Sequence, residues 1–204
     1  SDISTFSFHP VKPITTAEGG MITTNDKKIF QKLLLFRTHG ISKISNNFEN
    51  KNLAFDKKNR PNQWYYEMTA LGHNYRITDI QAALGNSQLK RIDKFINHRR
   101  KIAKIYKQDL RNNKFLQLPF DGKNIKHAYH LYTILVDFKN LKKERNQVMR
   151  ELREKKIGSQ VLYIPVHLQP FYRKKNLQKN KSFKNALNYY NKCCLLYTSP
   201  SPRY

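Results

Sequence analysis

The residue with the clearest chemical potential is Lys12, in the segment 9–19. A lysine amine is protonated near neutral pH and becomes a nucleophile only when it is desolvated and held in place. Pro10 and Pro13 exclude a regular helix around Lys12, and Gly19 gives the backbone freedom to turn back. We therefore expect a lysine on a stiff loop, in position to form a Schiff base with a carbonyl group. Because lysine is abundant in this chain, a surface lysine in a proline-rich turn is the more frequent outcome for these residues alone.

Regular elements are expected on both sides of this loop. Residues 4–8 and 20–24 are rich in β-branched and aromatic side chains, which predicts two short strands. Asn25 or Asp26 can then cap a helix that Gly40 ends. The loop would thus be held between two strands.

A long helix and a second domain are expected further along. Residues 41–70 are polar and irregular, and we interpret them as a long excursion. Thr78-Asp79-Ile80-Gln81 has the form of a capping box, and apolar residues keep helical spacing from there to about residue 111. An unbroken helix over that range would be roughly 50 Å long and would link two domains.

The C-terminal part has the order strand, helix, strand. Residues 129–138 and 159–164 predict strands, and the basic amphipathic segment 141–156 predicts a helix that Gly158 ends. This order favours a small α/β domain. Residues 193–204 have neither periodicity nor a clear terminus and look like translated vector sequence, so they are left out of the expected fold.

The composition limits the classes of partner. The chain has 39 Lys and Arg against 14 Asp and Glu, a net charge of +25 that would suit nucleic acid. The basic residues are spread along the whole sequence, however, which favours a solvated basic surface and leaves a nucleic-acid-binding protein as the alternative. The histidines lack Cys or acidic companions at ligand spacing, so we expect no metal site.

The cellular compartment is predicted from the lack of membrane-span and signal-peptide patterns and from the position of two cysteines. No stretch approaches the roughly 18 apolar residues of a membrane span, and the first residues lack the charged start and apolar run of a signal peptide. Cys193 and Cys194 are adjacent and cannot join distant segments, which fits a reducing compartment. We therefore predict a cytoplasmic protein without a membrane partner.

An ordered set of motifs resembles the DegT/DnrJ/EryC1/StrS family of nucleotide-sugar aminotransferases. The likeness covers about residues 1–190, and within the family it is strongest for the branch of pseudaminic acid biosynthesis. The motifs are FSFHPVKPITTAEGG at 6–20, RTHG at 37–40, GHNYRITDIQAALG at 72–85, SQL at 87–89, HLY at 130–132 and YIPVHLQPFY at 163–172.

The resemblance implies an α/β fold, that of the type I pyridoxal-phosphate (PLP) transferases, working as a homodimer. Residues 1–100 would be the C-terminal part of the PLP-binding large domain with the start of the interdomain helix, and residues 101–192 the small α/β domain. Lys12 would bind PLP and carry a proton between substrate and cofactor. Ser7 would contact the PLP phosphate, and Asn74 would reach the cofactor phosphate of the partner subunit.

The implied reaction is the transfer of an amino group, with glutamate as the expected donor, to the C4 keto group of a UDP-linked 6-deoxy-hexose. Tyr163 and His167, on either side of Pro165, are candidate contacts to the UDP-sugar, although a buried and satisfied histidine is the more frequent case. A family member that only binds sugar or regulates is a further alternative, against which the retention of Lys12 argues.

The chain also departs from the family pattern. In this family, the aspartate that pairs with the pyridine nitrogen, the ring stacked on PLP and much of the phosphate-binding turn precede the lysine. Only eleven residues precede Lys12 here. We therefore expect a C-terminal fragment that binds cofactor poorly by itself, because the pyridine partner keeps PLP an electron sink.

Overall fold

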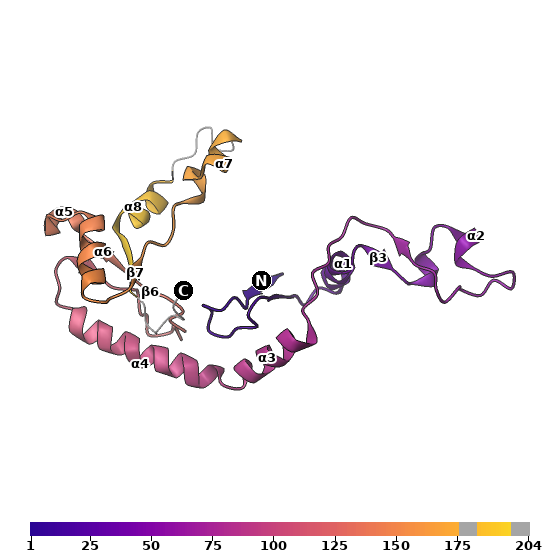
Figure 1. Cartoon of the computed structure of the whole chain (residues 1–204), viewed down its shortest axis with the longest axis horizontal. Helices are drawn as coiled ribbons and strands as arrows, with labels where there is room; N and C mark the ends of the chain where they lie inside the picture. The colour runs from indigo at the N-terminus through magenta and orange to yellow at the C-terminus, as the bar shows by residue number, and fades with distance from the viewer. Residues whose placement is uncertain (176–182, 197–204) are drawn as a thin grey trace. The chain divides into compact units, whose positions relative to one another are not determined.

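The computed structural model describes residues 1–175 and 183–196. The chain forms two compact units, residues 1–90 (the N-terminal unit) and residues 91–204 (the C-terminal unit) (Figure 1). The division falls between Lys90 and Arg91, earlier than the expected position after residue 100.

The N-terminal unit begins with an antiparallel hairpin and a capped helix. Strand β1 (Ser4–Ser7) pairs with β2 (Gly20–Thr23), so that Ser7 lies opposite Gly20. The carboxylate of Asp26 then accepts hydrogen bonds from the backbone N–H groups of Lys28 and Ile29, at 2.7 and 3.0 Å, and starts α1 (Lys27–Arg37). Both strands and the cap are as the sequence predicts.

Two glycines let the chain cross itself after α1. Gly40 has φ +70° and donates its N–H to the carbonyl of Leu35 at 2.9 Å, which ends the helix. A Cβ on Gly40 would lie 1.7 Å from the carbonyl oxygen of Ala70, and a Cβ on Gly72 would lie 2.1 Å from the nitrogen of Gly40. The crossing therefore requires glycine at both positions.

The segment predicted as an irregular excursion contains short ordered elements. The Glu67 carboxylate accepts bonds from the backbone N–H groups of Glu49 and Asn50 and from the hydroxyl of Tyr65. The two backbone donors are the main reason that the pKa of Glu67 lies below its ordinary value. The elements are β3 (Ile41–Ser42), the 3-10 turn η1 (Ser45–Asn47), α2 (Lys51–Ala54) and β4 (Glu67–Met68), with β3 antiparallel to β4.

The predicted single helix from residue 78 to about residue 111 is wrong. The structure has α3 (Asp79–Leu89) and α4 (Ile92–Leu110) as separate helices. Arg91 leaves the helical conformation, with φ −111° and ψ 5°, and its carbonyl accepts a new first bond from the N–H of Phe95. The regular apolar spacing continues through this break, so periodicity alone does not reveal it.

The C-terminal unit is built on a four-stranded sheet with the order β5-β6-β8-β7, in which neighbouring strands are antiparallel. Since β6 and β7 are both antiparallel to β8, they run parallel to each other with β8 between them. The predicted strand-helix-strand order is thus present, but a further strand, β8, lies between its two strands in the sheet. The strands are β5 (Leu116–Gln117), β6 (Tyr132–Val136), β7 (Ser159–Gln160) and β8 (Cys193–Leu196).

Residues 193–196, which the sequence does not place in the fold, thus form a central strand of this sheet. Cys193 and Leu195 pack with Leu162 in one buried cluster, while Cys194 packs in another that contains Tyr132. The alternation is that of a strand with both faces covered. The remaining part of the suspect tail, residues 197–204, lies outside the described residues.

The helices of this unit are shorter than predicted. The strand expected over 159–164 is also shorter, because only Ser159 and Gln160 pair with β8. The expected helix over 141–156 is interrupted at Lys142, which has φ +53°. Within the described part of the chain, no helix is both long and apolar enough to cross a membrane. The helices and turns are α5 (Phe138–Leu141), α6 (Arg145–Glu154), η2 (Val166–Leu168), α7 (Pro170–Lys174) and α8 (Lys184–Lys192).

The place of β8 in the core predicts a large effect of Leu195→Ala. Leu195 is 1% exposed, so the truncation should lower the free energy of unfolding by about 2–4 kcal/mol. The exposed Leu168 in the same unit is the matched control, for which Leu168→Ala should cost less than about 1 kcal/mol. Urea denaturation followed by far-UV circular dichroism measures both values, and equal small losses would show that β8 is not part of the core.

Candidate active site

Lys12 is the last residue of a tight turn. Its N–H donates to the carbonyl of His9 at 2.9 Å, and Pro10 occupies the second position of the turn. Proline is favoured there because its ring presets the backbone angle that the turn requires. The side chain of Lys12 is partly buried. The turn therefore fixes the backbone that carries the amine.

The loop that carries this turn is closed at its base by main-chain bonds. The N–H of Phe8 donates to the carbonyl of Gly19 at 2.9 Å, directly after the β1–β2 pairing ends. The carbonyl of Phe8 accepts from the N–H of Thr16 at 3.0 Å and from the hydroxyl of Thr15 at 3.0 Å. Residues 8–19 thus form a closed loop (the lysine loop).

Thr16 anchors the lysine loop on α3. It is 1% exposed, and its hydroxyl donates to the carbonyl of Glu18 at 2.7 Å. A Cβ on Gly19 would lie 2.4 Å from that hydroxyl oxygen, and a Cβ on Gly85 of α3 would lie 2.9 Å from the Thr16 methyl carbon. The two glycines make the space that Thr16 fills.

Gln81 provides a second link between α3 and the lysine loop. It completes the predicted capping box, because its side-chain oxygen accepts from the N–H of Thr78 at 2.9 Å and its own N–H donates to the Thr78 hydroxyl at 3.3 Å. Its Nε2 atom donates to the carbonyl of Glu18 at 2.9 Å. The capping box is as the sequence predicts, but the link to Glu18 is not predicted; the available signal is that residue 81 is a glutamine, which can donate, and not a glutamate.

Ser7 lies at the mouth of the lysine loop, at the end of β1. Its Oγ accepts a long bond from the N–H of His9 at 3.5 Å, which leaves the hydroxyl proton available for a ligand. The Nε2 of His9, a residue with no predicted role, lies 4.0 Å from the carboxylate of Glu18. Ser7 and Lys12 therefore belong to one connected piece of structure.

Asn74 lies on the segment that leads into α3. It forms a backbone bridge with Thr38, and its Oδ1 accepts a bond from the Nε of Arg76 at 2.7 Å. That bond orients the amide, so its NH₂ group is left to donate. The neighbouring rings of His73 and Tyr75 are stacked, with centroids 4.7 Å apart, which stiffens this exposed segment.

Tyr163 and His167 lie in the C-terminal unit. Tyr163 is 67% exposed, while the ring of His167, in η2, stacks on Phe183 at 4.4 Å. Pro165 starts η2, so the chain turns between the two candidates. Their proposed contact with a UDP-sugar remains a prediction.

The residues of the lysine loop fit a phosphorylated aldehyde cofactor. A primary amine stands on a fixed turn, and a serine hydroxyl at the mouth of the loop can donate to a phosphate. Among the described residues, no three His, Cys, Asp or Glu side chains are grouped as metal ligands.

Comparison with known proteins agrees with this chemistry. The sequence pattern of the DegT/DnrJ/EryC1/StrS aminotransferase family matches residues 1–202. The protein MJ1066 of Methanocaldococcus jannaschii is 40% identical over 91% of this chain and 46% of its own length. The UDP-4-amino-4,6-dideoxy-N-acetyl-beta-L-altrosamine transaminase of Campylobacter jejuni is 36% identical over 93% of this chain and 45% of its own length.

A solved structure shows the same fold. The chain superposes on PseC of Helicobacter pylori, an aminotransferase involved in the biosynthesis of pseudoaminic acid, with a TM-score of 0.78 and 31% identity, over 96% of this chain and 47% of that one. The predicted α/β fold of a PLP-dependent sugar aminotransferase is confirmed. The chain belongs to the DegT/DnrJ/EryC1/StrS aminotransferase family and spans about half the length of the curated relatives it matches.

The double role of Gln81 leads to a testable prediction. Gln81→Glu keeps the acceptor of the capping box but replaces the donor to the Glu18 carbonyl with a charged oxygen. Amide hydrogen exchange of residues 8–19 should accelerate about ten-fold, as expected for the loss of one hydrogen bond of about 1 to 1.5 kcal/mol.

Asn86→Asp is the control for this experiment, since it adds the same charge at an exposed position of α3. Exchange of the lysine loop should be unchanged in that variant. Equal acceleration in the two variants would mean that the added charge, and not the lost bond, loosens the loop.

Proposed function

We propose that the full-length protein is a PLP-dependent aminotransferase that moves an amino group, from glutamate as donor, to the C4 keto group of a UDP-linked 6-deoxy-hexose. The observation that carries this proposal is the partly buried Lys12 on a loop closed by hydrogen bonds at its base. Membership of the aminotransferase family supports it.

In this proposal, Lys12, Ser7 and Asn74 each have a role in cofactor binding or catalysis. Lys12 would hold the cofactor by its amine, and the same amine would move a proton at the reacting carbon of the substrate. The Ser7 hydroxyl donates to the cofactor phosphate, and the oriented amide of Asn74 donates to the phosphate bound by a second subunit. PLP supplies the electron sink for the chemistry.

The choice of nucleotide sugar rests on the names of relatives, and these names include both UDP-linked and GDP-linked sugars. The C. jejuni relative carries a UDP-sugar in its name, while a relative from Escherichia coli O157:H7, 36% identical over 85% of this chain, is a GDP-perosamine synthase. Fold and family do not fix the sugar. A UDP-linked amino-sugar precursor of the pseudaminic acid type is our choice, with Tyr163 and His167 as candidate contacts.

Exposed apolar side chains support a longer protein and a homodimer. Ile80 is 84% exposed, Leu71 83% and Tyr75 72%, all within the N-terminal unit. Exposed apolar patches on a soluble domain often mark a contact surface. We propose that the remaining half of the protein and a second subunit cover the segment 71–80, which carries these three side chains.

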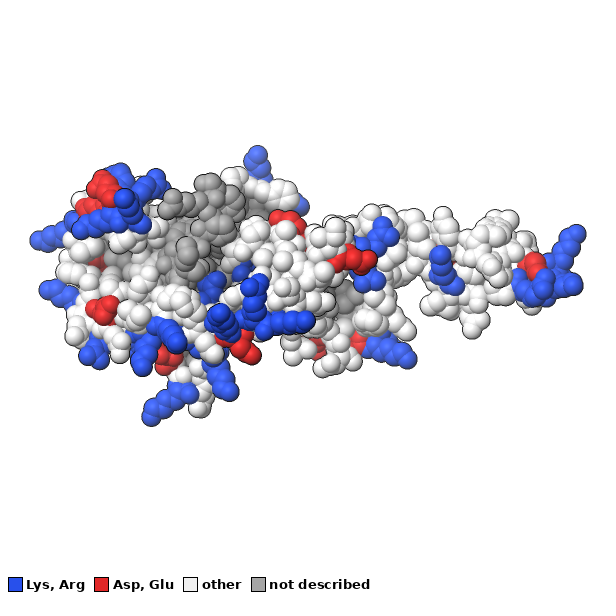
Figure 2. All heavy atoms as spheres, turned by 60° about the horizontal axis from the view of Figure 1, so that its bottom comes forward, with Lys and Arg blue, Asp and Glu red and all other residues white. Residues whose placement is uncertain are grey.

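The face shown in Figure 2 gives no comparable support for a nucleic-acid-binding protein, because its Lys and Arg side chains are scattered and Asp and Glu side chains lie among them. A nucleic-acid site instead requires a continuous basic surface.

Replacement of Lys12 tests the central assignment. The full-length protein, incubated with PLP and reduced with borohydride, should carry the added phosphopyridoxyl mass on the peptide that contains Lys12. Lys12→Ala should lose both this labelled peptide and the transamination activity, while Lys28→Ala, an exposed lysine of α1, should keep both. Labelling and turnover that persist in Lys12→Ala would refute the assignment.

Ser7→Ala tests the phosphate contact. Loss of one hydrogen bond to a charged group should weaken PLP binding about ten-fold or more, because such bonds contribute about 1.5–3 kcal/mol. Cofactor titration followed by absorbance measures the change. Ser4→Ala, at a partly buried serine of the same strand, is the control, and an unchanged affinity in Ser7→Ala would exclude the contact.

A further inference from the structure

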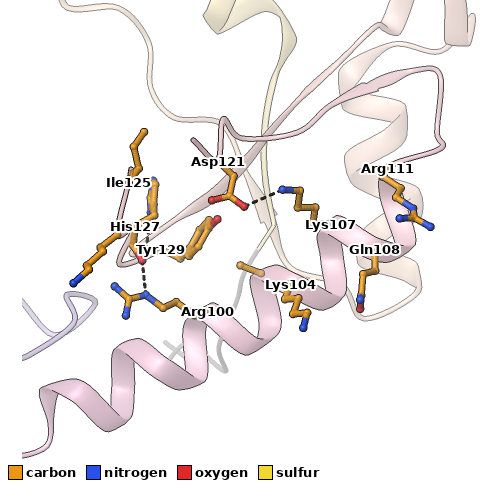
Figure 3. Close-up of a pocket in the computed structure, with 11 residues that line it drawn as sticks. Arg100, Lys104, Lys107, Gln108, Arg111, Asp121, Ile125, His127 and Tyr129 are labelled. Atoms are coloured by element: carbon orange, nitrogen blue, oxygen red, sulfur yellow. Dashed lines mark hydrogen bonds and ion pairs between the residues drawn. The ribbon is translucent and has the colours of Figure 1, made fainter. Parts of the chain in front are cut away.

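A basic groove lies in the C-terminal unit, between α4 and the chain that leads to β6 (Figure 3). Its volume is about 540 Å³, within the range of sites for small molecules. Five cationic side chains and a single carboxylate, that of Asp121, line it. The cations are Arg100, Lys104, Lys107, Arg111 and Lys126.

Four of these cations form a stripe along α4 and its C-terminal cap. Arg100, Lys104, Lys107 and Arg111 are spaced by four, three and four residues, which places them on one face of the helix. The helix dipole favours Lys107 and Arg111 near the C-terminus, but it does not account for Arg100 and Lys104. Like charges at this spacing repel each other by a few tenths of a kcal/mol per pair. The stripe therefore costs stability unless an anion lies beside it.

The single carboxylate of the groove is already engaged. Asp121 accepts a hydrogen bond from the Nζ of Lys107 at 2.9 Å, and this bond is the main reason that the pKa of Asp121 lies below its ordinary value. Among the ion pairs of residues 1–175 and 183–196, Lys107 alone of the five cations is joined to a carboxylate. Most of the positive charge of the groove is thus uncompensated within the described chain.

The wall opposite α4 is held in place. The Nε of Arg100 donates to the carbonyl of His127 at 2.9 Å, and the Nδ1 of His127 accepts from the N–H of Tyr129 at 2.8 Å. The rings of His127 and Tyr129 stack at 4.3 Å, and Tyr129 is 9% exposed. The exposed ring of His127 therefore rests on a buried neighbour and offers a flat surface inside the groove.

We propose that this groove binds a small phosphorylated ligand through a diphosphate group. Diphosphate oxygens match several cations spaced along one helix face better than a single phosphate does, because the group is longer and more highly charged. The groove volume leaves room for more than the diphosphate itself, and the His127 ring could stack on a flat group attached to it. This site is formed by residues 100–129 alone and does not depend on the role of Lys12.

Titration with inorganic pyrophosphate tests the proposal. The full-length protein is titrated by isothermal calorimetry at about 150 mM salt, where long-range surface attraction is screened. The double variant Lys104→Gln, Lys126→Gln removes two cations of the groove and should bind pyrophosphate about ten-fold more weakly or worse. Circular dichroism checks that these substitutions of exposed residues leave the fold intact.

The matched control removes two charges from exposed residues outside the groove. The double variant Lys94→Gln, Lys155→Gln replaces a lysine in the first turn of α4 and the lysine that caps α6. It should change the affinity by less than about two-fold, since neither residue lines the groove and distant exposed charges are screened. Equal weakening in both double variants would overturn the proposal, because it would show a general field effect. Absence of pyrophosphate binding to the unaltered protein would overturn it as well.

Two further ligands identify the source of the diphosphate. If uridine diphosphate binds about ten-fold more tightly than pyrophosphate, and the double variant Lys104→Gln, Lys126→Gln loses this added affinity, stacking in the groove contributes and the ligand is a nucleotide; equal affinities assign the groove to the free anion. Both results support a diphosphate site. A single-stranded oligonucleotide that binds more tightly than either, with a steep loss as salt rises, would replace the proposal with a nucleic-acid surface.

Discussion

The carbonyl oxygen of Glu18 accepts two hydrogen bonds, and the position of the lysine loop depends on both. One comes from the Thr16 hydroxyl within the loop and the other from Gln81 of α3. Thr16 can be buried there because Gly19 and Gly85 leave room for it. A group that must meet a reacting carbon needs a fixed position, since small displacements cost large factors in rate. The hairpin and α3 together provide that fixed position for Lys12.

The local features of this arrangement could be predicted from the sequence. β-branched and aromatic residues marked β1 and β2, Asp26 marked the start of α1, and Thr78 with Gln81 marked the start of α3. Each is a signal read within a few residues of chain. The chemical role of Lys12 could not be predicted from local signals alone. Its residue type and the flanking prolines made it a candidate nucleophile, and the resemblance to a family indicated its role in cofactor binding.

Features that depend on distant residues could not be predicted in this way. The bond from Gln81 to Glu18 and the short approach of Gly85 to Thr16 join segments that are far apart in sequence. The four apolar residues 193–196 carry no period, so only their pairing with β6 and β7 defines them as a strand. The basic stripe on α4 was visible in the spacing of its residues, but the wall that makes it a groove was not.

The insertion of β8 between β6 and β7 has a consequence for how the C-terminal unit folds. The two strands precede β8 in the chain and cannot become neighbours in the finished sheet without it. Until β8 arrives, each exposes an unpaired edge, and contacts between residues distant in sequence form slowly. Tyr132 pairs opposite Leu196 and Ser159 opposite the same residue, so one short late-synthesised strand closes both edges. During synthesis, the interval before that closure is when this unit is most exposed to aggregation and to chaperones.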